Sequence, residues 1–563
     1  MTSASKTPEP VQLESIILFH LICTVLTFYQ QSQVSVRVLL TFNELRNLSQ
    51  KQIGGMMKKI FVFALLSLCI LSLGTVPAFA ASKDRLVIGL VQGTKILDPQ
   101  ATTIGVALGL IGHIHETLVT IKDGKITPML AESWKILDDK ATYVFTIKQG
   151  VKFHNGETMT VDDVVYSFKR AKSPAGVASR AMSMYLKDVE KIDDRTIKLI
   201  TEQPLGEAFL GSLTHPWSSI LSRKAVEKFG ADYGQNPVGT GKFKLKDWSA
   251  SGDLVEMERF DEYHGVKAKL KTLIFRSIIE AASRTIELES GAVDTVADLA
   301  HVDISRIRNN PKLEVVMVPS VRHYYLAFEV NLKPFDNVKV REAFSLAMNR
   351  RGMVKAAFWG HAEVARGVLP STIMHNNYNN AEDFAYDPAK GKKLLAEAGV
   401  PQGFKTEIII SDRNDYMSIG TILQNNLKEI GVEVELKVYE PGAYFNIQRK
   451  PLHPPVINNW SANVASPDPF FATTPLLHST LAGLTNRAFY KNPEVDSLLE
   501  KGAETMDPAQ RTLIYKELWD KLNHDLPYVW LLTPINISGK VKNLKGIDFS
   551  HNVGSYYSDA YFE

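Results

Sequence analysis

At 563 residues the chain exceeds what one hydrophobic core ordinarily organises, so two or more domains are expected. Hydrophobic residues make up 45% and charged residues 22%, a balance typical of globular proteins and not of disordered or membrane-spanning chains. Six of the 64 Lys and Arg and three of the 61 Asp and Glu precede residue 81, so the remainder carries equal numbers of both signs. This balance gives no electrostatic footprint for nucleic acid or an anionic membrane, and no nucleic-acid partner is expected.

The segment 56–80 has the features of a secretory signal peptide in the right order. Lys58 and Lys59 precede an apolar run over 60–73, and the small-residue pattern Ala78-Phe79-Ala80 follows it. The run is shorter than the roughly 20 residues that a membrane-spanning helix needs. We therefore predict cleavage after this pattern; the alternative is a buried core helix.

Residues 1–55 have no evident place in an exported protein. We interpret them as a mis-called upstream extension, with translation starting at Met56 or Met57. Both cysteines, Cys23 and Cys69, precede the predicted cleavage point. The exported chain would therefore have no thiol, disulfide or cysteine metal site.

Strand and helix signals alternate along the rest of the chain, which favours a mixed α/β architecture. The predicted strands are rich in β-branched and aromatic residues and cover 85–91, 142–147, 432–438 and 528–533. The turn pair Asn155-Gly156 follows the second of them.

The predicted helices are marked by capping residues. Thr160 with Asp163 forms a capping-box pattern, and Asp387-Pro388 and Asp507-Pro508 each place proline at a first helical position. Two helices also show one apolar face, and the residues assigned to these inner faces are Ile419, Ile422, Leu423, Leu427 and Ile430 in one and Leu513, Ile514, Leu518 and Leu522 in the other.

No motif for catalysis stands out. The stretch 234–239 resembles the opening of a phosphate-binding loop, but Thr240 stands where lysine is required. Neither a G-x-S-x-G elbow nor an H-E-x-x-H helix occurs in the sequence. We therefore predict that the protein is not an enzyme and uses no cofactor.

Three ordered stretches carry a family signature. They are Pro128-Met-Leu-Ala-Glu-Ser-Trp134 running on to Asp163-Val-Val-Tyr-Ser-Phe168, then Asn236-Pro-Val-Gly-Thr-Gly-Lys-Phe243, then Val340-Arg-Glu-Ala343 followed by Leu394-Leu-Ala-Glu-Ala-Gly399. Together they resemble the family 5 extracellular solute-binding proteins of peptide- and nickel-type ABC importers. The resemblance covers essentially residues 84–563.

The resemblance implies a type II periplasmic-binding-protein fold, with two lobes, a hinge between them and an extra subdomain in lobe I. Lobe I would take 84–122, 238–328 and 535–563, the extra subdomain 123–237, and lobe II 329–534. The strands Tyr325–Val330 and Tyr528–Thr533 would cross between the lobes and flex when the lobes close.

The implied function is that of a periplasmic, monomeric substrate-binding protein. It would capture a peptide-like or other small polar solute between its lobes and deliver it to an ABC transporter permease in the inner membrane. Two alternatives stay open: a nickel chelate, haem or modified peptide bound on the same fold, and a sensory or chaperone-like periplasmic receptor.

In peptide-binding relatives an aspartate in a W-x-A-D-x-x-D-P segment holds the ligand's α-ammonium. The segment here begins at Trp460, and Asn463 occupies the aspartate's position, while Asp468 could supply a charge from nearby. An enclosed ammonium without a counter-charge loses several kcal/mol of solvation. We therefore expect a ligand that lacks a free α-ammonium at this point or binds it elsewhere.

The remaining candidate residues surround this segment by analogy. Arg413 offers a guanidinium fork for a carboxylate, unless it is solvated or paired with Asp412 or Asp415. Trp460 and Tyr416 offer flat apolar walls, and Gly93 and Thr94 offer backbone donors after the first strand. His478 lies where nickel-binding relatives carry a metal-contacting histidine, but one imidazole selects a metal weakly, so no metal site is predicted.

Overall fold

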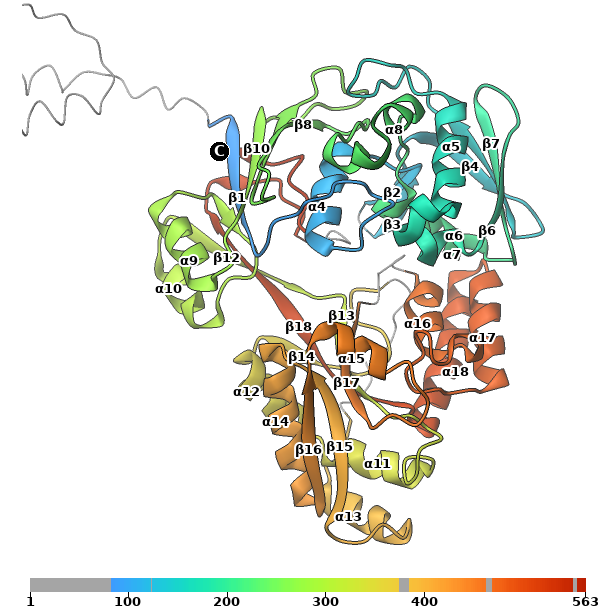
Figure 1. The fold of residues 1–563 in the computed structure, drawn as a ribbon, viewed down its shortest axis with the longest axis vertical. Coiled ribbons are helices and arrows are strands. Elements are labelled where there is room, and N and C mark those ends of the chain that lie inside the picture. The colour runs from blue at the N-terminus through green and yellow to red at the C-terminus, as the bar shows by residue number, and fades with distance from the viewer. Residues whose placement is uncertain (1–82, 123, 374–383, 462–467, 550–553) are drawn as a thin grey trace, which may run out of the picture. The chain divides into compact units, whose positions relative to one another are not determined.

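The computed structural model describes residues 83–122, 124–373, 384–461, 468–549 and 554–563. Its strands form one 12-stranded sheet and three smaller ones, and helices alternate with strands along the chain, as predicted (Figure 1). Among these residues, none of the helices is both long and apolar enough to span a bilayer.

The large sheet consists of two parts that share the strand β18, Tyr528–Val541. The first part contains β1 (Arg85–Leu90), β8 (Phe243–Trp248), β9 (Leu254–Arg259), β10 (Thr272–Ser277), β11 (Thr295–Val296) and β12 (Leu313–Pro319). The second part contains β13 (Arg322–Ala327), β14 (Ala362–Val364), β15 (Phe404–Ser411), β16 (Val432–Tyr439) and β17 (Val456–Ser461).

The change from one part to the other occurs at two prolines. In β18, residues 528–534 pair with β13 and β14, and residues 535–541 pair with β12. Pro534 has no N–H to give to a ladder, so a change of partner at this residue leaves no donor unpaired. Pro319 lies opposite Ile535, and the carbonyl of Pro534 accepts a hydrogen bond from the Ser320 amide at 3.0 Å. The two chain crossings are therefore neighbours.

These pairings bear differently on the two predicted lobe limits. The change of partner within β18 coincides with the predicted limit between residues 534 and 535. The other change lies between Pro319 and Arg322, before the predicted limit at residue 328. Consequently β13, which contains the first half of the predicted crossing strand Tyr325–Val330, pairs wholly within the second part.

Both faces of the second part are buried. Tyr324 and Leu326 of β13 contribute to one hydrophobic cluster, and the alternating residues Tyr325 and Ala327 contribute to another. The first cluster is covered by α11 (Val338–Ala347), α12 (Arg350–Phe358), α13 (Pro388–Glu397), α14 (Asn414–Glu429) and α15 (Pro441–Ile447). The second is covered by α16 (Pro469–Leu477), α17 (Pro493–Glu504) and α18 (Pro508–Asp525), which Figure 1 shows as one group.

Residues 123–237, the predicted extra subdomain, contain a separate four-stranded sheet in the order β4-β5-β7-β6. Its elements are β4 (Ala131–Ile136), β5 (Thr142–Ile147), β6 (Leu186–Lys191) and β7 (Thr196–Thr201), with α5 (Val161–Lys172), α6 (Arg180–Ser183), α7 (Gly206–Ser212) and α8 (Arg223–Phe229). A hairpin of β2 (Val119–Lys122) and β3 (Lys125–Pro128) precedes it.

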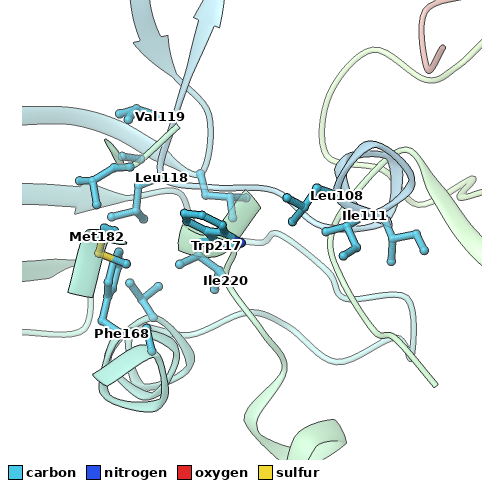
Figure 2. Close-up of a cluster of buried hydrophobic side chains, with 14 of the residues drawn as sticks. Leu108, Ile111, Leu118, Val119, Phe168, Met182, Trp217 and Ile220 are labelled. Carbon is cyan, nitrogen blue, oxygen red and sulfur yellow. The ribbon is translucent and has the colours of Figure 1, made fainter. Parts of the chain in front are cut away.

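This region shares its core with the first part of the large sheet. Figure 2 shows Trp217 between Leu108 of α4 (Gly105–Ile114) and a group that includes Phe168 and Met182. The Trp217 indole donates a hydrogen bond to the Thr102 carbonyl at 3.0 Å, which satisfies its one polar atom. The sheet is separate, but the hydrophobic cluster is continuous.

The remaining elements lie against the first part. The helix α9 (Ala281–Ser290) contacts β11 and β18, and α10 (Ile304–Asn309) contacts β12. Near the C-terminus, β19 (Leu544–Lys545) and β20 (Tyr561–Phe562) form a short antiparallel pair.

The capping predictions are confirmed. Thr160 accepts from the Asp163 amide while the Asp163 carboxylate accepts from the Thr160 amide, and Asp387 and Asp507 accept from the amides of Lys390 and Gln510. One inner-face prediction is wrong: Leu513 is 66% exposed. The buried stripe of α18 follows 511, 515, 518 and 522 with 514 beside it, and Leu513 falls off that stripe.

The Pro-Val-Gly-Thr-Gly signature has a packing role. A side-chain carbon at Gly239 would lie 2.1 Å from the Ile114 carbonyl oxygen, and one at Gly241 would lie 2.4 Å from the His113 carbonyl oxygen. Between them, Thr240 donates to the buried Glu116 carboxylate at 2.8 Å. Only glycine lets this segment approach the end of α4 so closely.

Replacing Gly241 with alanine should therefore destabilise the protein by about 1–3 kcal/mol, because backbone atoms would have to move apart. Gly112→Ala, within α4 and with open space at its Cβ position, is the matched control. It should be neutral or slightly stabilising because alanine favours helix. Urea denaturation measures both, and equal midpoints for the two variants would contradict this packing role.

Candidate functional site

The predicted ligand segment joins a strand to a helix. The strand β17 runs to Ser461, paired with Arg322 of β13, and α16 begins at Pro469. Trp460 lies in β17 opposite His323. Asn463 lies outside the described residues, so its predicted role stays a prediction.

Asp468, at the end of this segment, is 1% exposed and already has a counter-charge. The Arg511 guanidinium of α18 lies 2.9 Å from its carboxylate, and Arg511 is equally buried. The same carboxylate caps α16 by accepting from the Phe470 amide at 2.9 Å. These contacts give Asp468 the role of fixing the start of α16 and speak against a free negative charge for the solute.

Arg413 and Tyr416 lie at the start of α14. Arg413 is exposed and donates to the Asp415 carboxylate at 2.7 Å. Pairing with Asp415 was one of the alternatives to ligand binding that the sequence left open. Asp415 also accepts from the Tyr324 hydroxyl of β13. Tyr416 is 3% exposed between Tyr324 and Tyr444, and burial raises the pKa of its hydroxyl to about 12. It belongs to the core, which corrects the expectation of an open pocket wall.

Gly93 and Thr94 follow β1 and pack against the turn at Gly252. A side-chain carbon at Gly93 would lie 2.2 Å from the Gly252 carbonyl oxygen, which itself accepts from the Thr94 amide at 3.1 Å. The Thr94 amide is thus used within the protein, which speaks against it as a donor to the solute.

His478 ends α16, and its ring lies 3.5 Å from the Glu500 carboxylate and 4.0 Å from that of Asp496. The two carboxylates face different ring nitrogens, so they do not converge on one point. Within the part of the chain that the structure describes, no group of three His, Cys, Asp or Glu could hold a metal ion.

A buried arginine that the sequence did not single out, Arg487, immediately precedes Ala488, which belongs to the hydrophobic cluster on the face of the second sheet opposite Tyr416. Arg487 is 7% exposed, and none of the described residues accepts a hydrogen bond from its Nη1. No motif surrounds it, so only burial distinguishes it from a surface arginine.

The Asp468–Arg511 pair should contribute to the stability of the folded protein as well as fix the start of α16. Arg511→Met should cost about 3–5 kcal/mol, because it leaves a buried carboxylate without its counter-charge. Adding Asp468→Asn should recover part of this loss, since the amide oxygen can still cap α16. Lys516→Met, in the exposed pair with Asp520 on the same helix, should cost under about 1 kcal/mol. A similar small loss for Arg511→Met in urea unfolding would contradict this account.

His323, opposite Trp460, should make the fold acid-sensitive. Burial lowers its pKa to about 4, so the folded protein keeps it neutral while the unfolded chain takes up a proton below about pH 6.5. Its contribution is therefore complete above pH 6.5 and is lost as the pH falls towards 4, by about 1.4 kcal/mol per pH unit. His323→Gln should reduce the slope of unfolding free energy against pH in that interval; an unchanged slope would refute the assignment.

Comparisons with known proteins agree with this architecture. The family described as "Bacterial extracellular solute-binding proteins, family 5 Middle" matches residues 125–479. The glutathione-binding protein GsiB of Salmonella typhimurium is 32% identical over 502 residues, covering 87% of this chain and 96% of its own length.

Solved structures show the same fold. The periplasmic binding protein DppA of Helicobacter pylori, in complex with the peptide STSA, matches with a TM-score of 0.73 and 28% identity over 86% of this chain and 98% of its own. AgaA of A. tumefaciens R10, in complex with agropinic acid, matches with a TM-score of 0.72 and 25% identity over 85% and 99%. The predicted type II periplasmic-binding-protein fold is confirmed. The chain belongs to the family 5 bacterial extracellular solute-binding proteins.

Proposed function

We propose that this protein captures a peptide-like solute of the glutathione class and delivers it to the permease of an ABC importer. The observation that carries the proposal is the 32% identity with GsiB over 96% of that protein's length. The DppA match supports a peptide-like solute, and the AgaA match supports tolerance of other small polar solutes on the same fold.

The sequence of the ligand segment fits this class of solute. Asn463 stands where relatives that bind ordinary peptides place an aspartate for the α-ammonium. Glutathione is joined through the side-chain carboxyl of its glutamate, so its ammonium and a carboxylate share one carbon. A neutral amide suits such a zwitterionic end better than an isolated carboxylate, because the ligand carries its own counter-charge.

We propose Trp460 and Asn463 as the ligand-contacting residues of this segment. Arg413 is proposed as a contact for a carboxylate of the solute, which must first replace Asp415 as the partner of the guanidinium. Gly93 is proposed as a residue whose backbone lies next to the solute. Asp468, Tyr416 and Thr94 would act by holding the surrounding structure.

Export through the signal peptide at 56–80, to a periplasmic location, belongs to the same proposal. So does the absence of catalysis, which is the rule in a family of transport receptors. Recovery of the bound solute chemically unchanged after prolonged incubation would support it, and turnover would contradict it.

Calorimetric titration of the exported chain tests the solute class. Glutathione should bind with micromolar or tighter affinity, and an unmodified dipeptide should bind at least about 10-fold more weakly. Micromolar binding of the plain dipeptide would refute the proposed role of Asn463, and failure of glutathione and all short peptides to bind would refute the solute class.

Asn463→Asp should invert this preference by supplying a counter-charge for an ordinary α-ammonium. Dipeptide affinity should rise at least about 10-fold while glutathione binding falls or stays unchanged. Asn446→Asp, which adds the same charge at an exposed position of α15, is the control and should change neither affinity.

A further inference from the structure

Arg487 carries a buried positive charge that the described residues do not neutralise. It is 7% exposed, its Nη1 is fully enclosed without a hydrogen-bond partner, and no carboxylate among the described residues forms an ion pair with it. A buried charge without a partner costs free energy, so natural proteins seldom retain one without a use.

Other buried arginines of this chain are compensated. Arg284 donates to three carbonyls, those of Ile278, Ile279 and Asp298, and Arg341 donates to those of Phe335, Asp525 and Leu526. Arg511 has Asp468 and the Gly502 carbonyl. The chain therefore has several ways of satisfying an enclosed guanidinium, and Arg487 uses none of them.

The groups around Arg487 do not supply a negative charge. Three phenols, of Tyr325, Tyr528 and Tyr444, lie within electrostatic range. Burial raises the pKa of each phenol well above its usual value, so these hydroxyls stay neutral at physiological pH. Arg449 adds a second positive charge, and burial first, then this repulsion, lowers the pKa of Arg487.

The backbone at Arg487 is held firmly. Its carbonyl oxygen lies 2.8 Å from Nε2 of the buried His453, and the next carbonyl, of Ala488, accepts from the Val330 amide at 3.0 Å. On the other side, the Asn486 side chain donates to the Tyr490 carbonyl at 2.8 Å. A fixed backbone leaves only the side-chain torsions of Arg487 to be ordered when a ligand binds, which limits the entropy lost on binding.

The site lies beside the predicted ligand segment. Tyr325 of β13 is paired with Asn458 of β17, two residues before Trp460. Asn458 is 5% exposed and donates to the Gln448 side chain at 2.7 Å. The phenols of Tyr325 (β13), Tyr444 (α15) and Tyr528 (β18) thus lie near Arg487, and its neighbour Ala488 belongs to the cluster on the face of the sheet opposite Tyr416.

We propose that Arg487 is the counter-charge for a carboxylate of the captured solute, at a subsite distinct from Arg413. The inference rests on the proposed function and narrows it to solutes that bear a carboxylate able to reach β13. Such a carboxylate would accept from the guanidinium as a charge-assisted pair, shielded from water.

Titration of the exported chain with glutathione and with its two mono-amides tests the proposal. Arg487→Gln should weaken glutathione binding at least about 30-fold. The same substitution should have little effect on the affinity for one of the two mono-amides, the one in which the carboxylate that Arg487 binds has been converted to an amide. Arg449→Gln removes an exposed positive charge nearby and should change each affinity less than about 3-fold. Wild-type affinity for glutathione in Arg487→Gln would overturn the proposal.

A second measurement needs no peptide ligand and separates this inference from the proposed function. Without solute, Arg487→Gln should raise the melting temperature, because it removes an uncompensated buried charge. If Arg487 instead served only the fold, the same substitution would lower the melting temperature. Acetate should raise the melting temperature of the unaltered protein more than chloride at equal ionic strength, and Arg487→Gln should lose this difference. If glutathione and peptides fail to bind but these two results hold, the solute class is wrong and the carboxylate subsite stands. If Arg487→Gln lowers the melting temperature and acetate has no specific effect, the subsite is wrong.

Discussion

The pairing of β18 with strands on both of its ends is the constraint on which the rest of the structure depends. Every strand of the large sheet is connected to β18 either directly or through a continuous series of paired strands. Because Pro534 lacks an amide hydrogen, the strand can change partners at that residue without leaving a donor unpaired. The second crossing, at Ser320, is hydrogen-bonded to the same proline, so both connections between the two parts lie at one place.

Local signals predicted individual elements well. The capping residues Thr160, Asp387 and Asp507 each begin a helix, because a side-chain oxygen and a free amide three residues on are all that a cap needs. Strand limits were less accurate where they depend on partners far away in sequence. β18 continues to Val541 because β12 and β11 pair with it, and nothing within 528–541 itself announces those partners.

The candidate site, too, has features that local sequence indicates and features that depend on residues far away in sequence. The family resemblance predicts a ligand segment around Trp460 and Asn463, and that role stays a prediction. The resemblance could not reveal that Asp468 is matched by Arg511, since the two are 43 residues apart and neither lies in a pairing motif. Leu513 was assigned to the core for a similar reason: apolar character was visible, but the exact rotation of α18 depends on its packing against α17. Arg487 is indistinguishable in sequence from a solvated arginine, and only its enclosure marks it.

The anchoring of the ligand segment at both ends has an evolutionary consequence. On one side Ser461 is held in the sheet opposite Arg322, and on the other Asp468 is held by Arg511 and by the Phe470 amide of α16. Both anchors described here are built from residues that flank this stretch: backbone pairing at one end, and a buried ion pair with a helix cap at the other. Substitutions at either anchor are therefore constrained by folding, whatever solute is bound.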